Sequence, residues 1–239
     1  MKILSDKRLN VITAIILVIL ISSVIVVCFL PNKVVHISGG KTYEPYYSGD
    51  RGQNNVGLTF NVYEGSNIVE GILNVLEKYD AKATFFVGGC WVDDNEEILI
   101  KILEKGHEIG SHGYFHKDHS KLSENANREE MVLLHNLVKR VTGYDITLFA
   151  PPSGAFSVTT LKVAESLGYK TILWTKDTID WRDKSKQIVY NRATKNVLGG
   201  DIVLMHPKQH TLDALPQILD FYKKQGLTPT TVSECIGIK

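Results

Sequence analysis

The stretch "LTFNVYEGSN", residues 58–67, begins the first regular alternation of strand and helix in this 239-residue chain. The apolar run over residues 57–62 predicts a buried strand, and the periodic apolar residues of "IVEGILNVLEKY" after it predict a helix. Asn61 and Val62 close that strand. In a sheet of parallel strands this end usually carries the chemistry, so an amide followed by an aliphatic residue is an unexpected pair there.

The alternation of strand and helix continues to the C-terminus. Five later stretches are expected to contain apolar strands: "ATFFVGG", "EIGSH", "ITLFAPPSG", "YKTILWT" and "DIVLMH". A last short strand is expected near residues 229–232. Helical periodicity separates them, around residues 96–106, 128–142, 158–168, 185–197 and 212–225. Strands that alternate with helices predict a parallel sheet of right-handed β-α-β units. Six or seven units in about 180 residues predict an α/β fold, a small closed or nearly closed (β/α) barrel.

The first thirty residues differ from the rest of the chain. Residues 11–30 carry no charge, whereas Lys2, Lys7 and Arg8 precede them. At about 1.5 Å per residue this run spans the roughly 30 Å core of a bilayer. We therefore predict a cytoplasmic N-terminus (1–10) and one transmembrane helix (11–30) that anchors the chain in the cell membrane, with the remainder outside. A cleavable signal peptide is the alternative, but its apolar region would be shorter and would end in small residues.

Composition limits the classes of binding partner and indicates where the folded domain begins. With 27 basic and 26 acidic residues the chain has no strong positive electrostatic field of the kind that binds nucleic acid. Residues 31–55 contain two prolines and four glycines without periodicity, which predicts a linker before a domain over 56–239. Cys90 and Cys235 could form a disulfide, although two scattered cysteines are more often unpaired core residues. The oligomeric state is left open.

Polar residues recur where the predicted strands end. Asn61 ends the first strand, His112 the third and His206 the sixth, and Asp177 and Asp180 follow the fifth. Because the strand ends of a (β/α) barrel converge on one mouth, these side chains are expected to form one site. Each residue alone has a simpler explanation, such as a helix cap or a hydrogen-bonded turn.

Two histidines in "SHGYFHKDH" are candidate metal ligands. His112 and His116 are four residues apart, so they would share one face of a helical turn and could bind one ion. His119 and Asp118 are expected to be solvated loop residues. In "VLMHP" the apolar residues lead to His206 before a proline, a position that suits a general acid or base.

Five ordered motifs resemble those of the NodB-like polysaccharide deacetylases (carbohydrate esterase family four) over about residues 56–236. The motifs are "TFNVYEG", "SHGYFH", "APPSG", "KDTIDW" and "VLMHP". The resemblance implies a distorted, incompletely closed (β/α) barrel and removal of acetyl groups from peptidoglycan, chitin-like polymers or xylan. It also implies a divalent metal, zinc or cobalt-like, held by His112 and His116, with His206 as general acid tuned by Asp180.

The first and third motifs depart from the family pattern. The family's first motif reads Thr-Phe-Asp-Asp-Gly, with a base followed by a metal ligand, but Asn61 and Val62 stand at those positions. In the third motif Ala150 replaces an arginine that holds the base, so the base and its partner are lost together. A metal with two histidines and no carboxylate would bind weakly or not at all. Glu64 is the preferred substitute, as base or as third ligand, and Asp118 or His119 could also complete the shell.

The resemblance also implies how sugar would be held. The substrate-binding candidates are Asn61, Pro152, Ser153, Trp181 and Leu204. Ser153 replaces a tyrosine whose backbone N–H helps form the oxyanion hole, and that donor survives because it is main chain.

Two hypotheses follow from these motifs. In the first, the chain is a membrane-anchored, metal-dependent de-N-acetylase of cell-wall glycan, which the surviving acid residues favour. In the second it is a pseudoenzyme of the same fold that binds glycan or acts as a scaffold at the envelope, which the changes in the first motif favour.

Overall fold

Strand β1 (Asn55–Val62) lies at the centre of the sheet and is buried along nearly its whole length. It pairs in parallel with β2 on one side and β7 on the other, and Asn61 faces Phe86 in the register with β2. The computed structural model describes Leu17 and residues 42–238, and the compact unit that holds β1 begins at Tyr43. The buried strand that the sequence predicted over residues 57–62 is therefore present and begins two residues earlier.

All strand pairs among the described residues are parallel, and their order is β5-β4-β3-β2-β1-β7-β6, with β8 beside the start of β1. The strands are β1 (Asn55–Val62), β2 (Thr84–Val87), β3 (Glu108–Ser111), β4 (Leu148–Phe149), β5 (Lys170–Thr171), β6 (Lys176–Asp177), β7 (Ile202–Met205) and β8 (Thr228–Thr230). The sheet is a curled parallel half-barrel of the NodB type, as predicted.

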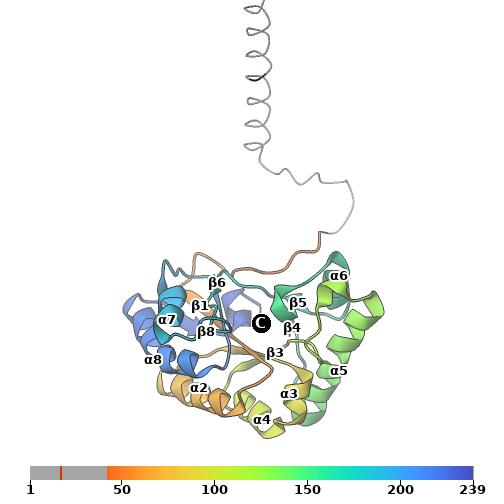
Figure 1. The fold of residues 1–239 in the computed structure, drawn as a ribbon, viewed down its shortest axis with the longest axis horizontal. Helices are drawn as coiled ribbons and strands as arrows, with labels where there is room; N and C mark the ends of the chain where they lie inside the picture. Colours follow the sequence, from red (N-terminus) through yellow and green to blue (C-terminus); the bar gives the residue numbers. More distant parts are fainter. Residues whose placement is uncertain (1–16, 18–41, 239) are drawn as a thin grey trace, which may run out of the picture. The chain divides into compact units, whose positions relative to one another are not determined.

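Helices surround the strands on the outer side (Figure 1). They are α2 (Ser66–Lys78), α3 (Gly89–Asp93), α4 (Glu96–Glu104), α5 (Glu124–Thr142), α6 (Val158–Ser166), α7 (Lys186–Thr194), α8 (Gln209–Lys224) and α9 (Val232–Cys235), with short 3-10 turns η1 (His119–Lys121) and η2 (Pro152–Gly154). In α2 the apolar residues Val69, Ile72, Leu73 and Leu76 recur at helical spacing and are all buried. In α2 the apolar periodicity that predicted the helix thus marks its buried face.

The segment "YKTILWT", predicted as one strand, differs from the expectation. The structure divides it into β5, which pairs with β4, and β6, which pairs with β7. Between them the chain crosses from one edge of the sheet to the other. The hydrogen bonds change partner strand along this segment. Ile172 N–H donates to Phe149 O in β4 (2.8 Å), whereas Thr175 N–H donates to Ile202 O in β7 (3.1 Å).

Part of the predicted linker runs along the barrel. Tyr46 N–H donates to Thr171 O and Leu173 N–H donates to Tyr46 O, both at 2.8 Å, and Gly49 N–H donates to Gly200 O at 2.8 Å. Tyr46 and Ser48 form isolated bridges with Ile172 and Asp201. Residues 46–49 therefore connect the segment after β5 with the segment before β7.

Two further sequence-based expectations concern the N-terminus and the cysteines. The predicted transmembrane segment 11–30 lies outside the described residues apart from Leu17, and no helix among the described residues is long and apolar enough to cross a membrane. Cys90 is exposed on α3, Cys235 is buried in α9, and both are free thiols.

Candidate functional site

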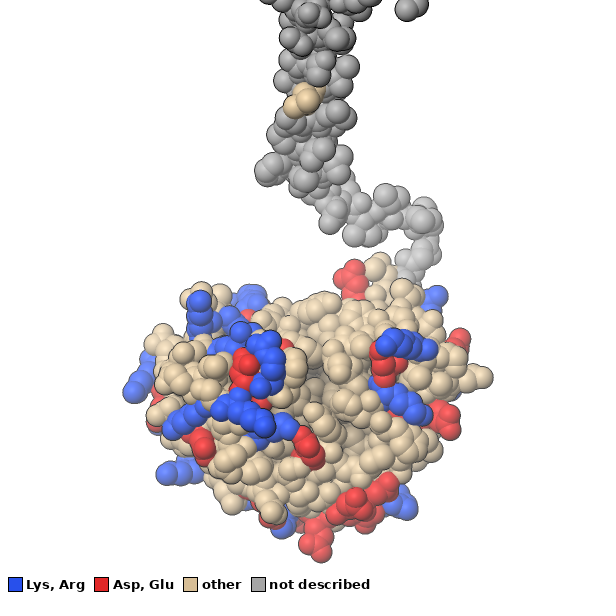
Figure 2. Space-filling model, viewed as in Figure 1, with Lys and Arg blue, Asp and Glu red and all other residues tan. Residues whose placement is uncertain are grey.

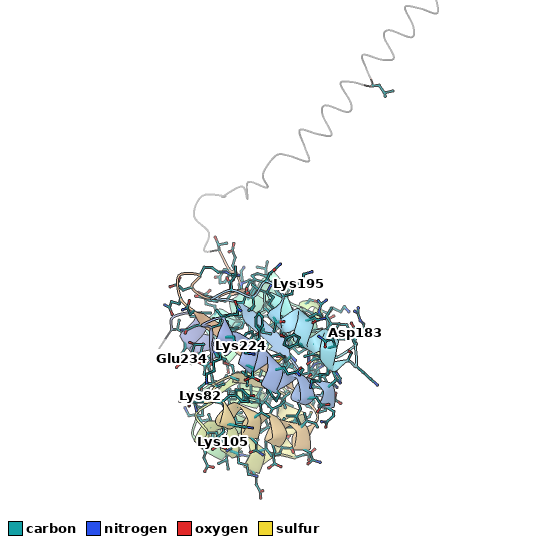
Figure 3. All side chains as sticks on the ribbon, turned by 90° about the vertical axis from the view of Figure 1, so that its left-hand side faces the viewer. Lys82, Lys105, Asp183, Lys195, Lys224 and Glu234 are labelled. Carbon is teal, nitrogen blue, oxygen red and sulfur yellow. The ribbon has the colours of Figure 1, made fainter. Side chains whose placement is uncertain are left out.

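A pocket of about 300 Å³ opens where the strands end. Its lining residues lie in or just after β1, β3, β4, β5, β6 and β7, as the sequence predicted for a site at the mouth of a barrel. They are Asn61, Tyr63, His112, His116, Ser153, Trp174, Asp177, Trp181, Leu204 and His206. Figure 3 shows the domain from the side: Asp183, close in sequence to Trp181, lies at one end, and Lys82, Lys105 and Glu234 lie at the other.

His112 is fixed at the end of β3. It is 1% exposed, and its Nδ1 lies 2.7 Å from Ala150 O, a carbonyl that can only accept, so Nδ1 carries the proton and Nε2 is an acceptor. Burial, and next the neighbouring His116, lower the pKa of His112 to about 3. His112 is therefore a neutral imidazole over the physiological pH range.

His116 approaches His112 from a loop, so the predicted helical turn is wrong. Gly113 and His116 both have positive φ angles (75° and 55°), which no α-helical turn allows. The buried carboxylate of Glu130 holds this loop, accepting from the N–H groups of Tyr114 (3.0 Å) and Phe115 (2.8 Å). The two imidazoles nevertheless meet, with ring centroids 5.0 Å apart. Burial lowers the pKa of His116 as well.

Asp180 lies behind His206 and orients it. His206 Nδ1 is 2.7 Å from Asp180 Oδ1, and Asp180 Oδ2 accepts from the His206 N–H (2.7 Å) and from Thr211 Oγ1 (2.7 Å). Asp180 is 1% exposed and does not line the pocket itself. Because Nδ1 is engaged, His206 presents Nε2 as its free ring nitrogen, which is the arrangement needed for proton transfer to a bound ligand.

The first-motif positions hold no titratable group. Val62 is fully buried in the hydrophobic core, and at the third-motif position Ala150 is 3% exposed. Asn61 is 3% exposed, and its Oδ1 is buried without a hydrogen-bond partner among the described residues. An amide does not accept a proton at neutral pH, so Asn61 cannot act as a general base.

Glu64 lies outside the pocket. Its carboxylate forms an ion pair with Lys208 and is half exposed. The other candidates for completing a metal shell are also engaged: Asp118 caps η1 and pairs with Lys121, and His119 is buried against Asn127. The structure thus does not bring Glu64, Asp118 or His119 to the histidine pair.

Ser153 and Trp181 reach the pocket from different parts of the chain, one after β4 and one after β6. Ser153 has a left-handed φ of 56° and is followed by Gly154 (φ 66°), which leaves space for Trp174. Trp181 is 52% exposed with the Arg182 guanidinium 5.9 Å from its ring centroid. Pro152 is buried in the same turn as Ser153, and Leu204 lines the pocket from β7.

Two pocket residues, Tyr63 and Trp174, were missing from the sequence-based site, whereas Asp177 lines the pocket as expected. Tyr63 packs against His116, with ring centroids 4.4 Å apart, and its centroid lies 6.4 Å from that of His112 and 6.3 Å from that of His206. A signal for Tyr63 was available, since it occupies the glycine position of the Thr-Phe-Asp-Asp-Gly motif. Trp174 carried no such signal.

The residues present do not fit the metal that the resemblance implies. Such a site needs three protein ligands, and here two imidazoles stand beside an amide and a buried aliphatic side chain. Within residues 42–238 no group of three or more His, Cys, Asp or Glu side chains is arranged to hold an ion.

Comparison with known proteins places these features in a family. The polysaccharide deacetylase family model matches residues 48–172. The protein YlxY of Bacillus subtilis is 35% identical over 191 residues, which are 80% of this chain and 60% of YlxY. The peptidoglycan-N-acetylmuramic acid deacetylase PdaA of the same species is 31% identical over 198 residues, 80% of this chain and 75% of PdaA.

A solved structure is similar over the whole domain. BA3943 of Bacillus anthracis, described as a CE4 family pseudoenzyme, has a TM-score of 0.79 and 34% identity, covering 82% of this chain and 70% of that one. A mutant of BA3943 is described as having restored enzymatic activity. The half-barrel with its histidine pair is a NodB-like deacetylase domain. The chain belongs to the polysaccharide deacetylase family, as the motifs predicted.

Proposed function

We propose that this chain binds cell-wall glycan of the peptidoglycan type in its deacetylase pocket without metal-assisted hydrolysis. The observation that carries the proposal is the replacement of the base and the third metal ligand by Asn61 and Val62, neither of which transfers a proton. Loss of a general base alone typically reduces the rate by about a hundred- to ten-thousand-fold. Of the two hypotheses drawn from the sequence, the pocket chemistry supports the binding protein.

The pocket retains what sugar binding requires. Tyr63, Trp174 and Trp181 supply aromatic faces, and Asn61 and His206 supply hydrogen-bonding groups beside them. Pockets of this kind, with apolar walls and a few polar groups, are the usual form of small-ligand sites. The relatives named above include a peptidoglycan deacetylase and a pseudoenzyme, so cell-wall glycan is the ligand class that we assign to this pocket.

Slow de-N-acetylation is a second candidate, and one observation favours it. Asp180 is 1% exposed and accepts three hydrogen bonds, of which the one from His206 Nδ1 orients the imidazole ring. A buried carboxylate is costly to keep, and a binding site alone has no need for an oriented acid. His206 could then still donate a proton to a leaving amine.

We also propose that the chain acts at the cell envelope, anchored in the membrane through residues 11–30. The support for the anchor is the uncharged run of that segment and the basic residues Lys2, Lys7 and Arg8 before it. Cell-wall glycan is reached from outside the membrane, which agrees with a domain on that side.

Binding and turnover are tested together on the full-length chain. We expect it to sediment with insoluble peptidoglycan and to bind chitooligosaccharide. Trp181→Ala should reduce that binding, whereas Ile188→Ala, which removes an exposed apolar side chain outside the pocket, should not. Acetate release should be at least about a hundredfold slower than that of an active relative assayed in parallel. Release at the relative's rate, or failure to bind either glycan, would overturn the proposal.

A further inference from the structure

Tyr63 is the one aromatic side chain of the pocket that follows directly on the two altered first-motif positions. It is 38% exposed, and its ring lies 4.4 Å from the His116 ring and 6.4 Å from the His112 ring, centroid to centroid. A separation of 4.4 Å is direct ring-to-ring contact. The phenol ring therefore packs against the histidine pair.

The backbone that leads into Tyr63 is fixed by β1, so the placement of Tyr63 begins from the sheet. Gly88 N–H donates to Val62 O at 2.9 Å, and Gly88 has no side chain: a Cβ there would lie 3.6 Å from the Tyr63 Cβ. On the other side Glu64 pairs with Lys208 and does not line the pocket. Of residues 62–64, Tyr63 alone therefore lines the pocket.

An ion shared by two imidazoles lies about 2 Å from a nitrogen of each. Tyr63 is in contact with the His116 ring, so it occupies space beside the histidine pair. Glycine, which the family motif has at this position, would leave that space open. The loss of the two motif carboxylates and the gain of Tyr63 therefore both disfavour a metal ion at the histidine pair.

We propose that Tyr63 takes the place of the metal in this pocket: it covers the His112–His116 pair and provides an aromatic face on which an uncharged pyranose ring of the glycan packs. Trp174 and Trp181 line the same pocket, and among its lining residues there is no Lys or Arg to attract an anionic group. On the face seen in Figure 2, groups of charged side chains lie on either side of an uncharged strip. This inference rests on the proposed function, because it names the part of the ligand that the pocket holds.

The metal part of the proposal is tested by cobalt titration of matched variants of the full-length chain, read by absorbance and calorimetry. Val62→Asp restores a carboxylate, with or without Tyr63→Gly. Because Val62 is buried, Asn61→Asp with and without Tyr63→Gly forms a second pair for the case in which Val62→Asp does not fold. We expect the member of each pair that also carries Tyr63→Gly to bind cobalt at least about tenfold more tightly, a difference of about 1.4 kcal/mol. Equal affinity within a folded pair would overturn the proposal.

The glycan part is tested by binding of chitooligosaccharide. Tyr63→Gly should weaken binding about fivefold or more, as removal of an aromatic anchor does, and Tyr63→Phe should retain it. Tyr47→Gly makes the same substitution at an exposed tyrosine outside the pocket and should leave binding unchanged. If the unaltered chain binds and Tyr63→Gly binds equally well, this inference fails and the proposed function stands. If the unaltered chain binds no glycan, the proposed function fails, and with it the aromatic-face part of this inference.

Discussion

Replacement of His107 by leucine should remove a large part of the acid sensitivity of the domain. His107 lies between α4 and β3, is 5% exposed, and packs edge-on against Phe85 with ring centroids 5.5 Å apart. Neither of its ring nitrogens has a hydrogen-bond partner among the residues that the structure describes. Burial, and next the nearby Lys82 and Lys105 charges, lower the pKa of His107 from 6.5 to about 4. Figure 3 shows these two lysines on the same side of the domain.

The sign and size follow from proton linkage. Above pH 6.5 His107 is neutral in the folded and unfolded states, so it adds no pH dependence. Between pH 6.5 and 4 the unfolded chain binds a proton that the folded chain refuses, so the free energy of unfolding falls as the pH is lowered. A shift of about 2.5 pKa units at about 1.36 kcal/mol each corresponds to a loss of about 3 kcal/mol.

The assay is urea unfolding of the unaltered chain and of His107→Leu at about pH 7, 6, 5 and 4.5, a series that spans the linkage window. The difference at about pH 7 measures the packing change alone, and the other buried histidines are common to both proteins. We expect the free energy of unfolding of the variant, relative to that of the unaltered chain, to rise by about 2 to 3 kcal/mol as the pH falls from about 7 to 4.5. Parallel stability curves over this range would show that the buried imidazole does not govern the acid response.

Three further substitutions test the site and the sheet. Asp180→Ala leaves His206 and Thr211 without their shared partner and should cost about 3 kcal/mol in stability, measured by urea unfolding. Gly110→Ala places a Cβ 2.3 Å from the buried Phe86 ring and should destabilise the domain by about 1 to 3 kcal/mol; an unchanged midpoint would contradict the packing in β3. Trp181→Ala, at a half-exposed position, should weaken glycan binding while leaving the thermal unfolding temperature within a few degrees.

The elements of the fold were predictable because their patterns are local. The buried face of α2 repeats at the helical period, and β1 is a continuous apolar run between turn residues, so both were located from the sequence. The crossing between β5 and β6 was not predicted. It depends on hydrogen bonds from residues 172–175 to two strands that lie far apart in the chain, and periodicity within one segment carries no information about such partners.

The composition of the site was predictable where a residue's chemistry and its place at a strand end agree. His112 and His206 were identified in this way and His116 by its spacing from His112, and the structure brings all three to one pocket. Glu64 shows the limit of this reasoning: it lies in the loop next to the site in sequence, but its charge is satisfied by Lys208, which immediately precedes α8. Distance along the chain does not determine which partner a long carboxylate side chain finds.

The sequence by itself determined the family, the order of strands and helices along the chain, and the loss of the base and third ligand at Asn61 and Val62, because residue identities alone decide these. Only the tertiary structure decided what replaces them. The Tyr63 ring contacts the histidine pair because the loop held by Glu130 brings His116 against it. Those contacts join residues from separate strands and loops, and packing, rather than any local preference, sets them.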